Sequence, residues 1–115
     1  MELSRNEVLD RAGRAVNGDR THDYGGPESS FSKIAAYWQA YLDQIIKERN
    51  GDLCICGHDV ALMLALLKIA RLTTSPAHVD SWVDLAGYAA CGGEVASGML
   101  CGAPQPGEPI IEKSR

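Results

Sequence analysis

The sequence has no long hydrophobic run and no excess of positive charge. The longest apolar run, Val60 to Leu67, is far too short to cross a bilayer. Asp and Glu outnumber Lys and Arg by 15 to 11, so the formal charge is −4. No global basic surface therefore favours nucleic acid or a membrane as partner, and any anion site must be a local cluster of cations. The charged N-terminal residues MELSRNEVLD lack the hydrophobic core of a signal peptide, so we expect a cytoplasmic protein.

The common catalytic and metal-binding motifs are also missing. The sequence has no Walker loop, Rossmann fingerprint, HExxH motif or nucleophile elbow. Its four cysteines include Cys54 and Cys56, but this Cys-x-Cys followed by His58 has no matching second pair such as zinc sites use. We therefore interpret the cysteines, Cys91 and Cys101 included, as ordinary reduced thiols rather than a metal knuckle or a disulfide.

Apolar residues at helical spacing predict four helices. The first begins after Ser4, which forms a capping box with Glu7, and it stops at Asn17-Gly18. The second begins near residues 28–30 and ends at Asn50-Gly51.

The third predicted helix runs from about Gly57 to Leu72. It is apolar on every side, which is typical of a buried central helix. The fourth runs from about Val79 toward Met99, and Gly92-Gly93 is a candidate kink or split. Short turns join the helices, and no alternating strand pattern occurs.

These elements predict an all-α fold, a four-helix bundle, in a chain of 115 residues that has the length of one domain. We assign residues 1–101 to this domain and residues 102–115, with three prolines and two glycines, to a flexible tail. One small bundle cannot bury all of the apolar surface of this chain. The residues in excess include Tyr37, Trp38, Tyr41 and the Met99-Leu100 end. This excess favours a homo-oligomer.

The fourth helix has one polar and one apolar face. The residues of the polar face fall at i, i+4, i+7, i+8 and i+11, and they are Asp80, Asp84, Gly87, Tyr88 and Cys91. Val79, Val83, Ala86 and Ala90 form the other face, which suits a core. Two carboxylates one turn apart repel unless a cation lies between them, and magnesium with a substrate phosphate fits such a pair. The alternative is structural: Asp80 caps or starts the helix, and Asp84 pairs with Lys68 or Arg71.

Lys68 and Arg71 lie three residues apart on the apolar third helix. Such charges are costly there unless they are paired or lie at the rim of a cavity. The short turn makes the third and fourth helices antiparallel neighbours, so these cations should approach Asp80 and Asp84. Two readings stay open. The four residues form a salt-bridge network, or the cations form a phosphate pocket in which Arg71 supplies a bidentate fork and Lys68 a point charge.

The loop RTHDYGGP, which starts at Arg20, is the third candidate element. A polar and aromatic loop just before a helix N-terminus is a typical place to hold an anion or a base. Tyr24 could stack on a base, Arg20 could contact phosphate, and Asp23 could accept from a base or sugar. Lys33, one turn into the second helix, could face the same cleft. The alternative is a structural turn in which Asp23 caps the helix.

A resemblance to a known family rests on three segments of the sequence: HDYGGPESSFSKIAAYWQAYL, DVALMLALLKIARL and DSWVDLAGYAA. They look like a small phage-encoded all-α domain of uncharacterised function, over roughly residues 20 to 91. More distantly, this domain is similar to the MazG-like and dimeric-dUTPase all-α nucleoside triphosphate pyrophosphohydrolases and to a nucleotide-modification-associated domain. The resemblance implies a MazG-like bundle and, for a phage protein, a location in the cytoplasm of the infected host.

The pyrophosphohydrolases hold magnesium with Glu-x-x-Glu on one helix and Glu-x-x-Asp on another. Asp84 matches the Asp of the second motif, but Ser81 stands at its partner position, and Asp80 lies one residue earlier. The second helix has no Glu-x-x-Glu. We therefore expect a binder of a phosphorylated nucleotide without a clear catalytic apparatus, which could sequester a nucleotide signal. The predicted binding residues are Arg20, Asp23, Tyr24, Lys33, Trp38, Lys68, Arg71, Asp84 and Tyr88.

Two alternatives remain. One is a magnesium-dependent pyrophosphohydrolase with Asp80 and Asp84 as metal ligands. The other is a structural or interaction protein whose charged residues pair only with each other. No cofactor is required by the binding hypothesis, whereas Mg²⁺ belongs to the enzyme hypothesis.

Overall fold

A computed structural model describes residues 2–18 and 26–98. These residues form four helices and no strand, which confirms the all-α class. The helices are α1 (Arg5–Asn17), α3 (Pro27–Glu48), α4 (Gly57–Thr74) and α5 (Val79–Gly98). None of these helices is long and apolar enough to cross a membrane. The expected tail, Cys101 and the Met99-Leu100 end lie outside the described residues.

The helix ends follow the local sequence signals. At the start of α1, the backbone N–H of Ser4 donates to Glu7 Oε1 at 2.9 Å, and the N–H of Glu7 donates to Ser4 Oγ at 3.1 Å. The predicted capping box is therefore confirmed. At the end of α3, Asn50 and Gly51 take left-handed backbone angles with φ of 55° and 87°. An L side chain rarely adopts this conformation, so the helix stops here, as predicted.

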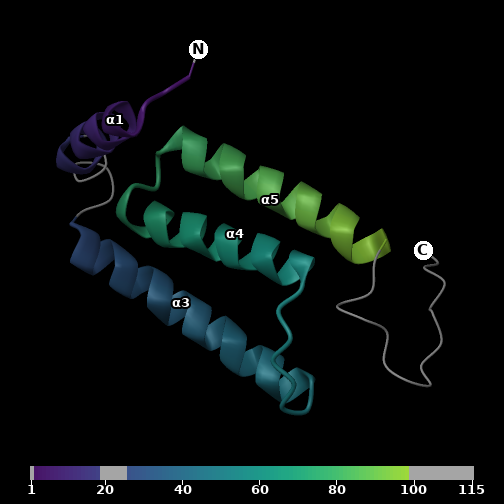
Figure 1. Cartoon of the computed structure of the whole chain (residues 1–115). Helices are drawn as coiled ribbons and strands as arrows, with labels where there is room; N and C mark the ends of the chain where they lie inside the picture. Colours follow the sequence, from purple (N-terminus) through teal and green to yellow (C-terminus); the bar gives the residue numbers. More distant parts are fainter. Residues whose placement is uncertain (1, 19–25, 99–115) are drawn as a thin grey trace.

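Three of the helices form a layer. Figure 1 shows α3, α4 and α5 side by side and alternating in direction, with α4 in the middle. The buried apolar residues come from both α3 and α4, and they include Ile34, Ile45, Ala65, Ala70 and Leu72. The prediction of a central third helix is therefore confirmed.

The contact between α4 and α5 depends on a glycine. Gly92 is buried, and a Cβ built on it would lie only 2.7 Å from the Cβ of Ala61. The helix axes can approach this closely because Gly92 has no side chain. α5 continues through Gly92-Gly93 as one helix, so the split suggested by this glycine pair is wrong. The glycine serves packing between helices instead of a break.

Two helix faces do not join the shared core. In α1 no residue is buried, so within the described chain α1 stands beside the α3–α5 layer and does not complete a closed four-helix bundle. The face of α5 with Val79 and Val83 was expected to suit a core, but these residues are 67% and 61% exposed. That expectation is wrong for Val79 and Val83, because α5 turns Ser81 and Gly92 toward α4.

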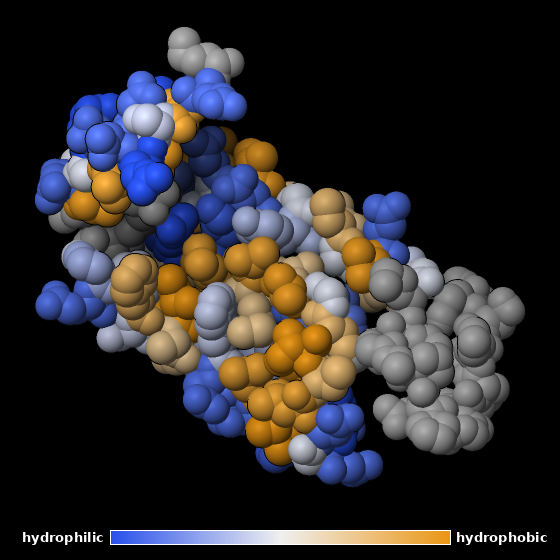
Figure 2. Space-filling view, viewed as in Figure 1, coloured by the Kyte–Doolittle hydropathy of each residue, from blue (hydrophilic) through white to orange (hydrophobic). Residues whose placement is uncertain are grey.

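Large hydrophobic residues are also exposed elsewhere on the layer. Figure 2 shows hydrophobic residues gathered across the visible face, over the side formed by α3 and α4. Ile46, Leu53, Ile55, Val60 and Leu62 are among the exposed large hydrophobic residues of these helices and their connection. Among residues 2–18 and 26–98, many large apolar side chains are therefore in contact with solvent.

Candidate functional site

The predicted cations gather at one end of the layer, where α3 begins, α4 ends and α5 begins (Figure 1). Lys33 reaches from the second turn of α3 to the last residues of α4. Its Nζ donates to Thr73 Oγ1 at 3.0 Å and to Thr74 Oγ1 at 2.7 Å. The Thr73 hydroxyl in turn donates to the carbonyl oxygen of Ala70 at 2.7 Å. Lys33 therefore faces the C-terminal end of α4, where a positive charge is favourable to the helix dipole.

Lys68 and Asp84 join α4 to α5. Lys68 Nζ lies 2.8 Å from Asp84 Oδ2, so the predicted approach of the two helices is confirmed for this pair. The Lys68 side chain is only 11% exposed, whereas that of Asp84 is 47% exposed. The lysine stem is thus packed between helices while its charged end reaches the rim, where a half-exposed carboxylate holds it.

Arg71 lies three residues after Lys68 on α4 and is half-buried. The spacing places the two side chains next to each other on one helix face. Asp80 lies in the first turn of α5 and is exposed, in agreement with the alternative in which it starts that helix. No group of three or more His, Cys, Asp or Glu side chains that could hold a metal ion occurs within residues 2–18 and 26–98.

The turn between α4 and α5 is fixed by its own side chains. His78 Nδ1 lies 2.9 Å from Ser81 Oγ and accepts from the Ser81 backbone N–H at 3.3 Å. Ser81 is fully buried. Trp82 Nε1 donates to the carbonyl oxygen of Pro76 at 2.8 Å. These bonds set where α5 begins, and therefore where Asp84 lies relative to Lys68.

The other predicted binding residues have different positions. Arg20, Asp23 and Tyr24 lie outside the described residues. Trp38 Nε1 donates to the Met63 carbonyl oxygen at 2.7 Å, which ties α3 to α4. Met63 precedes Lys68 by roughly 8 Å and Arg71 by roughly 12 Å along α4, so Trp38 meets α4 before the two cations. Tyr88 is half-buried on α5, one turn after Asp84.

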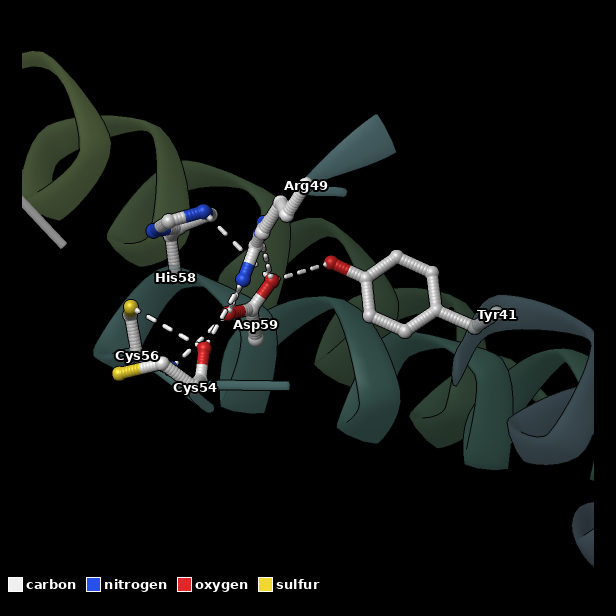
Figure 3. Close-up of polar contacts among 6 residues, drawn as sticks. All are labelled: Tyr41, Arg49, Cys54, Cys56, His58 and Asp59. Carbon is white, nitrogen blue, oxygen red and sulfur yellow. Dashed lines mark hydrogen bonds and ion pairs between the residues drawn. The ribbon is translucent and has the colours of Figure 1, made fainter. Parts of the chain in front are cut away.

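The most extensive polar network of the described residues surrounds Asp59, at the opposite end of α4 (Figure 3). Arg49 makes a bidentate ion pair with this carboxylate, from Nη2 to Oδ1 at 2.9 Å and from Nη1 to Oδ2 at 3.1 Å. The Tyr41 hydroxyl donates to Oδ1 at 2.6 Å, and the backbone N–H of Cys56 donates to Oδ2 at 2.9 Å. Asp59 itself is 0% exposed.

The hydrogen bonds of this network shift the pKa values of Asp59 and Tyr41. Burial by itself raises the pKa of Asp59, but the hydrogen bonds from Arg49, Tyr41 and the Cys56 N–H outweigh it and lower the pKa to about 2. Burial and the hydrogen bond to Asp59 raise the pKa of Tyr41 to about 12. Asp59 is therefore an anion whose oxygens are already occupied by donors. We interpret it as a structural link between α3, α4 and the connection between them, not as a binding group.

The sequence analysis missed this network, although a signal was present. Asp59 follows Cys56 by three residues, which is the spacing at which a carboxylate bonds back to the N-terminus of its helix. Among the cysteines, Cys54 and Cys91 are reduced, as expected, and both are exposed. Cys56 is disulfide-bonded, which corrects the expectation of a reduced thiol at this position. Spacing along the chain does not tell which thiols the fold brings together.

Comparison with known proteins places the chain among phage relatives. A family model described as a domain of unknown function, DUF6378, matches residues 7–96. The Gene 55 protein of Mycobacterium phage D29 is 38% identical over 84 residues, which cover 73% of this chain and 50% of the phage protein. The Gene 55 protein of Mycobacterium phage L5 is 39% identical over 82 residues, or 71% of this chain and 47% of the phage protein.

The chain thus spans about half the length of these two relatives. No solved structure matches it. The expected resemblance to a phage-encoded domain of uncharacterised function is confirmed, whereas the more distant similarity to pyrophosphohydrolases stays a prediction. With its match covering most of the described helices, the chain belongs to the DUF6378 family.

Proposed function

We propose that the protein binds a phosphorylated nucleotide at the end of the layer where α3 begins and α4 ends. The observation that carries this proposal is the gathering of Lys33, Lys68 and Arg71, from two helices, in a chain whose formal charge is −4. A local cation cluster on an acidic protein is what recognition of an anion requires.

The three cations suit different parts of a phosphate group. Arg71 carries the planar guanidinium that can hold two phosphate oxygens at once, and Lys68 offers a point charge. Asp84 holds Lys68 Nζ at 2.8 Å, and the Lys68 side chain is only 11% exposed, so a phosphate would reach this ammonium by replacing the half-exposed Asp84 carboxylate. The Lys33 ammonium lies at the end of α4, where it donates to the hydroxyl groups of Thr73 and Thr74.

The N-terminus of α3 adds a second favourable feature. Its N-cap is Gly26, which has no side chain to cap the first turn. Backbone N–H groups and the positive end of the helix dipole at such a terminus favour an anion. In the proposal, Arg20, Asp23 and Tyr24, which come just before Gly26 in the sequence, complete the site by contacting phosphate and base. Binding without turnover would sequester a nucleotide of the host.

The competing interpretation is structural, and two contacts favour it. Lys68 pairs with Asp84, and Lys33 is bonded to two threonines. If these contacts serve only to join helices, an apolar replacement of the pair should fold normally and change no binding property. The double variant Lys68→Met/Asp84→Leu separates the two interpretations, because the binding proposal requires that it lose affinity while it stays folded.

Thermal unfolding in the presence of a ligand panel tests the proposal. The panel contains pyrophosphate, nucleoside mono- and triphosphates and cyclic dinucleotides. A ligand at 100 times its Kd stabilises the folded state by about 2.7 kcal/mol, which raises the Tm of a domain of this size by roughly 10 °C or more. Pyrophosphate release in the presence of Mg²⁺ is measured in parallel, since it would favour the hydrolase alternative over binding alone.

A matched pair of lysine variants locates the site. Lys33→Gln should weaken binding of the active ligand at least tenfold. Lys47→Gln removes the same charge from the same helix, 14 residues or roughly 21 Å away, and should leave affinity unchanged. No Tm shift with any member of the panel, or an equal loss of affinity in both variants, would refute binding at this end of the layer.

A further inference from the structure

The outer face of α5 is an apolar surface that no described helix covers. Val79, Val83, Ala86 and Ala90 follow one another at spacings of four, three and four residues, which is the alternation of a helix–helix seam. Val79 and Val83 are 67% and 61% exposed, and Trp82 beside them is half exposed. The opposite side of α5 packs on α4 through Ser81 and Gly92.

α1 presents a second apolar face of the same kind. Val8 and Leu9 are 50% and 67% exposed, and Ala12, on the same side of the helix, is exposed as well. With 13 residues, α1 is at the length where an isolated helix is only marginally stable in water. Its capping box and amphipathic pattern therefore indicate a helix that is built to pack against a partner.

We propose that a second copy of this chain supplies that partner: α1 of each copy packs against the outer face of α5 of the other. The charges of the two helices support this pairing. α5 carries three carboxylates, Asp80, Asp84 and Glu94, and no Lys or Arg, and since Asp84 is paired with Lys68 of α4, Asp80 and Glu94 remain to attract a positive helix. α1 carries three arginines against Glu7 and Asp10, which gives it a charge of 3 − 2 = +1. Pairing α5 with α5 would instead bring like charges together.

The area required by a dimer favours an exchange of helices over a single contact. The apolar face of α5 from Val79 to Ala90 is about 18 Å long and about 10 Å wide, or roughly 180 Å², whereas a stable interface buries about 800 Å² on each partner. α5 alone therefore falls well short. An exchange of α1 helices adds a second face, about 20 Å long, on each copy, which brings the apolar contact to roughly 380 Å² on each copy, the area of a weak dimer. It also closes the assembly, because a twofold axis makes the two α1–α5 contacts identical and leaves neither face open.

The mass of the chain in solution, measured by light scattering after gel filtration, tests the proposal. The wild-type chain should be a dimer at tens of micromolar. Leu9→Glu and Val83→Lys should each weaken the dimer at least tenfold and elute as monomers. An equimolar mixture of these two variants should form a heterodimer, since one contact then pairs the new carboxylate with the new ammonium and the other contact is unchanged.

Two measurements exclude simple unfolding. Both substituted side chains are more than 60% exposed in the single chain, so circular dichroism should lose at most the signal of α1. Asp10→Lys places a new cation on the polar face of α1 and should remain dimeric. A monomeric wild type would overturn the proposal, as would a dimer that Leu9→Glu leaves intact, because α5 would then pair with something other than α1. Failure of the mixed variants to associate would show that α1 does not cross between copies. None of these results bears on nucleotide binding, which is measured separately.

Discussion

At the scale of single residues, Asp59 shows how one buried charge can join three segments. It accepts hydrogen bonds from Tyr41 on α3, from Arg49 just after α3 and from the backbone at the start of α4. A buried carboxylate is costly unless donors surround it, and here donors reach both of its oxygens. Replacing one of these residues is therefore destabilising, because the remaining ones keep buried polar atoms that have lost a hydrogen-bond partner.

The stability of the protein in acid should report on this residue. The pKa of Asp59 is about 2 in the folded protein, below its usual value of 3.8. A lowered pKa means that the stabilisation is fully present above about pH 4 and is lost as the pH falls toward 2. We expect Asp59→Asn to lower the free energy of unfolding at pH 7 by about 2–4 kcal/mol and to flatten its decline between pH 4 and pH 2. Urea denaturation across this range measures both effects.

Asp52→Asn is the control for this prediction, since Asp52 is an exposed aspartate in the connection that follows α3. It should change stability by less than about 0.5 kcal/mol and keep the wild-type decline in acid. An unchanged decline in Asp59→Asn would mean that another carboxylate controls the acid limb.

At the scale of the helices, the contact between α4 and α5 is set by the smallest residue in it. Gly92 lets Ala61 approach so closely that any Cβ would overlap with it. The same contact positions Asp84, two turns earlier on α5, opposite Lys68. The packing of the two helices and the geometry of the cation cluster are therefore coupled through one glycine.

A pair of glycine variants separates packing from helix propensity. Gly92→Ala should destabilise the protein by about 1–3 kcal/mol, because the overlap with Ala61 forces the helices apart. Gly87→Ala changes the same residue type within the same helix, where no atom lies within 4 Å of the new Cβ. It should stabilise the protein by about 0.5–1 kcal/mol. Thermal or urea denaturation gives both values. Two variants of equal stability would contradict the close approach.

At the scale of the whole molecule, residues 2–18 and 26–98 form an open layer of three helices with a fourth helix beside it. Only the central α4 has a helix on both sides, so among these residues the outer face of α5 and the apolar face of α1 remain exposed. In the proposed dimer, association with a second copy removes this apolar surface from water.

Association of this kind links stability to protein concentration. If dimerisation stabilises the fold, the Tm should rise by a few degrees for each tenfold increase in chain concentration, because only the folded chains associate. Leu9→Glu should remove this dependence. Differential scanning calorimetry at two concentrations measures it, and a Tm that does not change with concentration in the wild type would argue for a folded monomer.

The sequence by itself determined the local structure of this protein. The Ser4–Glu7 capping box, the stop at Asn50-Gly51 and the all-round apolar α4 fix the all-α class, because caps and helical periodicity act between residues a few positions apart. The short turn after α4 also made the meeting of Lys68 with Asp84 predictable, since a short connection forces two helices to be antiparallel neighbours.

Only the tertiary structure decided which helix faces meet. Periodicity shows that α5 has an apolar face, but it does not tell whether that face lies against α4 or toward solvent, and Val79 and Val83 are in fact exposed. The same holds for Gly92, because its sequence suggests a helix break and only the position of Ala61 shows that it serves close packing. It also holds for Asp59, whose hydrogen-bond partners lie up to 18 residues away in the sequence. These choices depend on the free energy of whole helices packing together, which no short stretch of sequence contains.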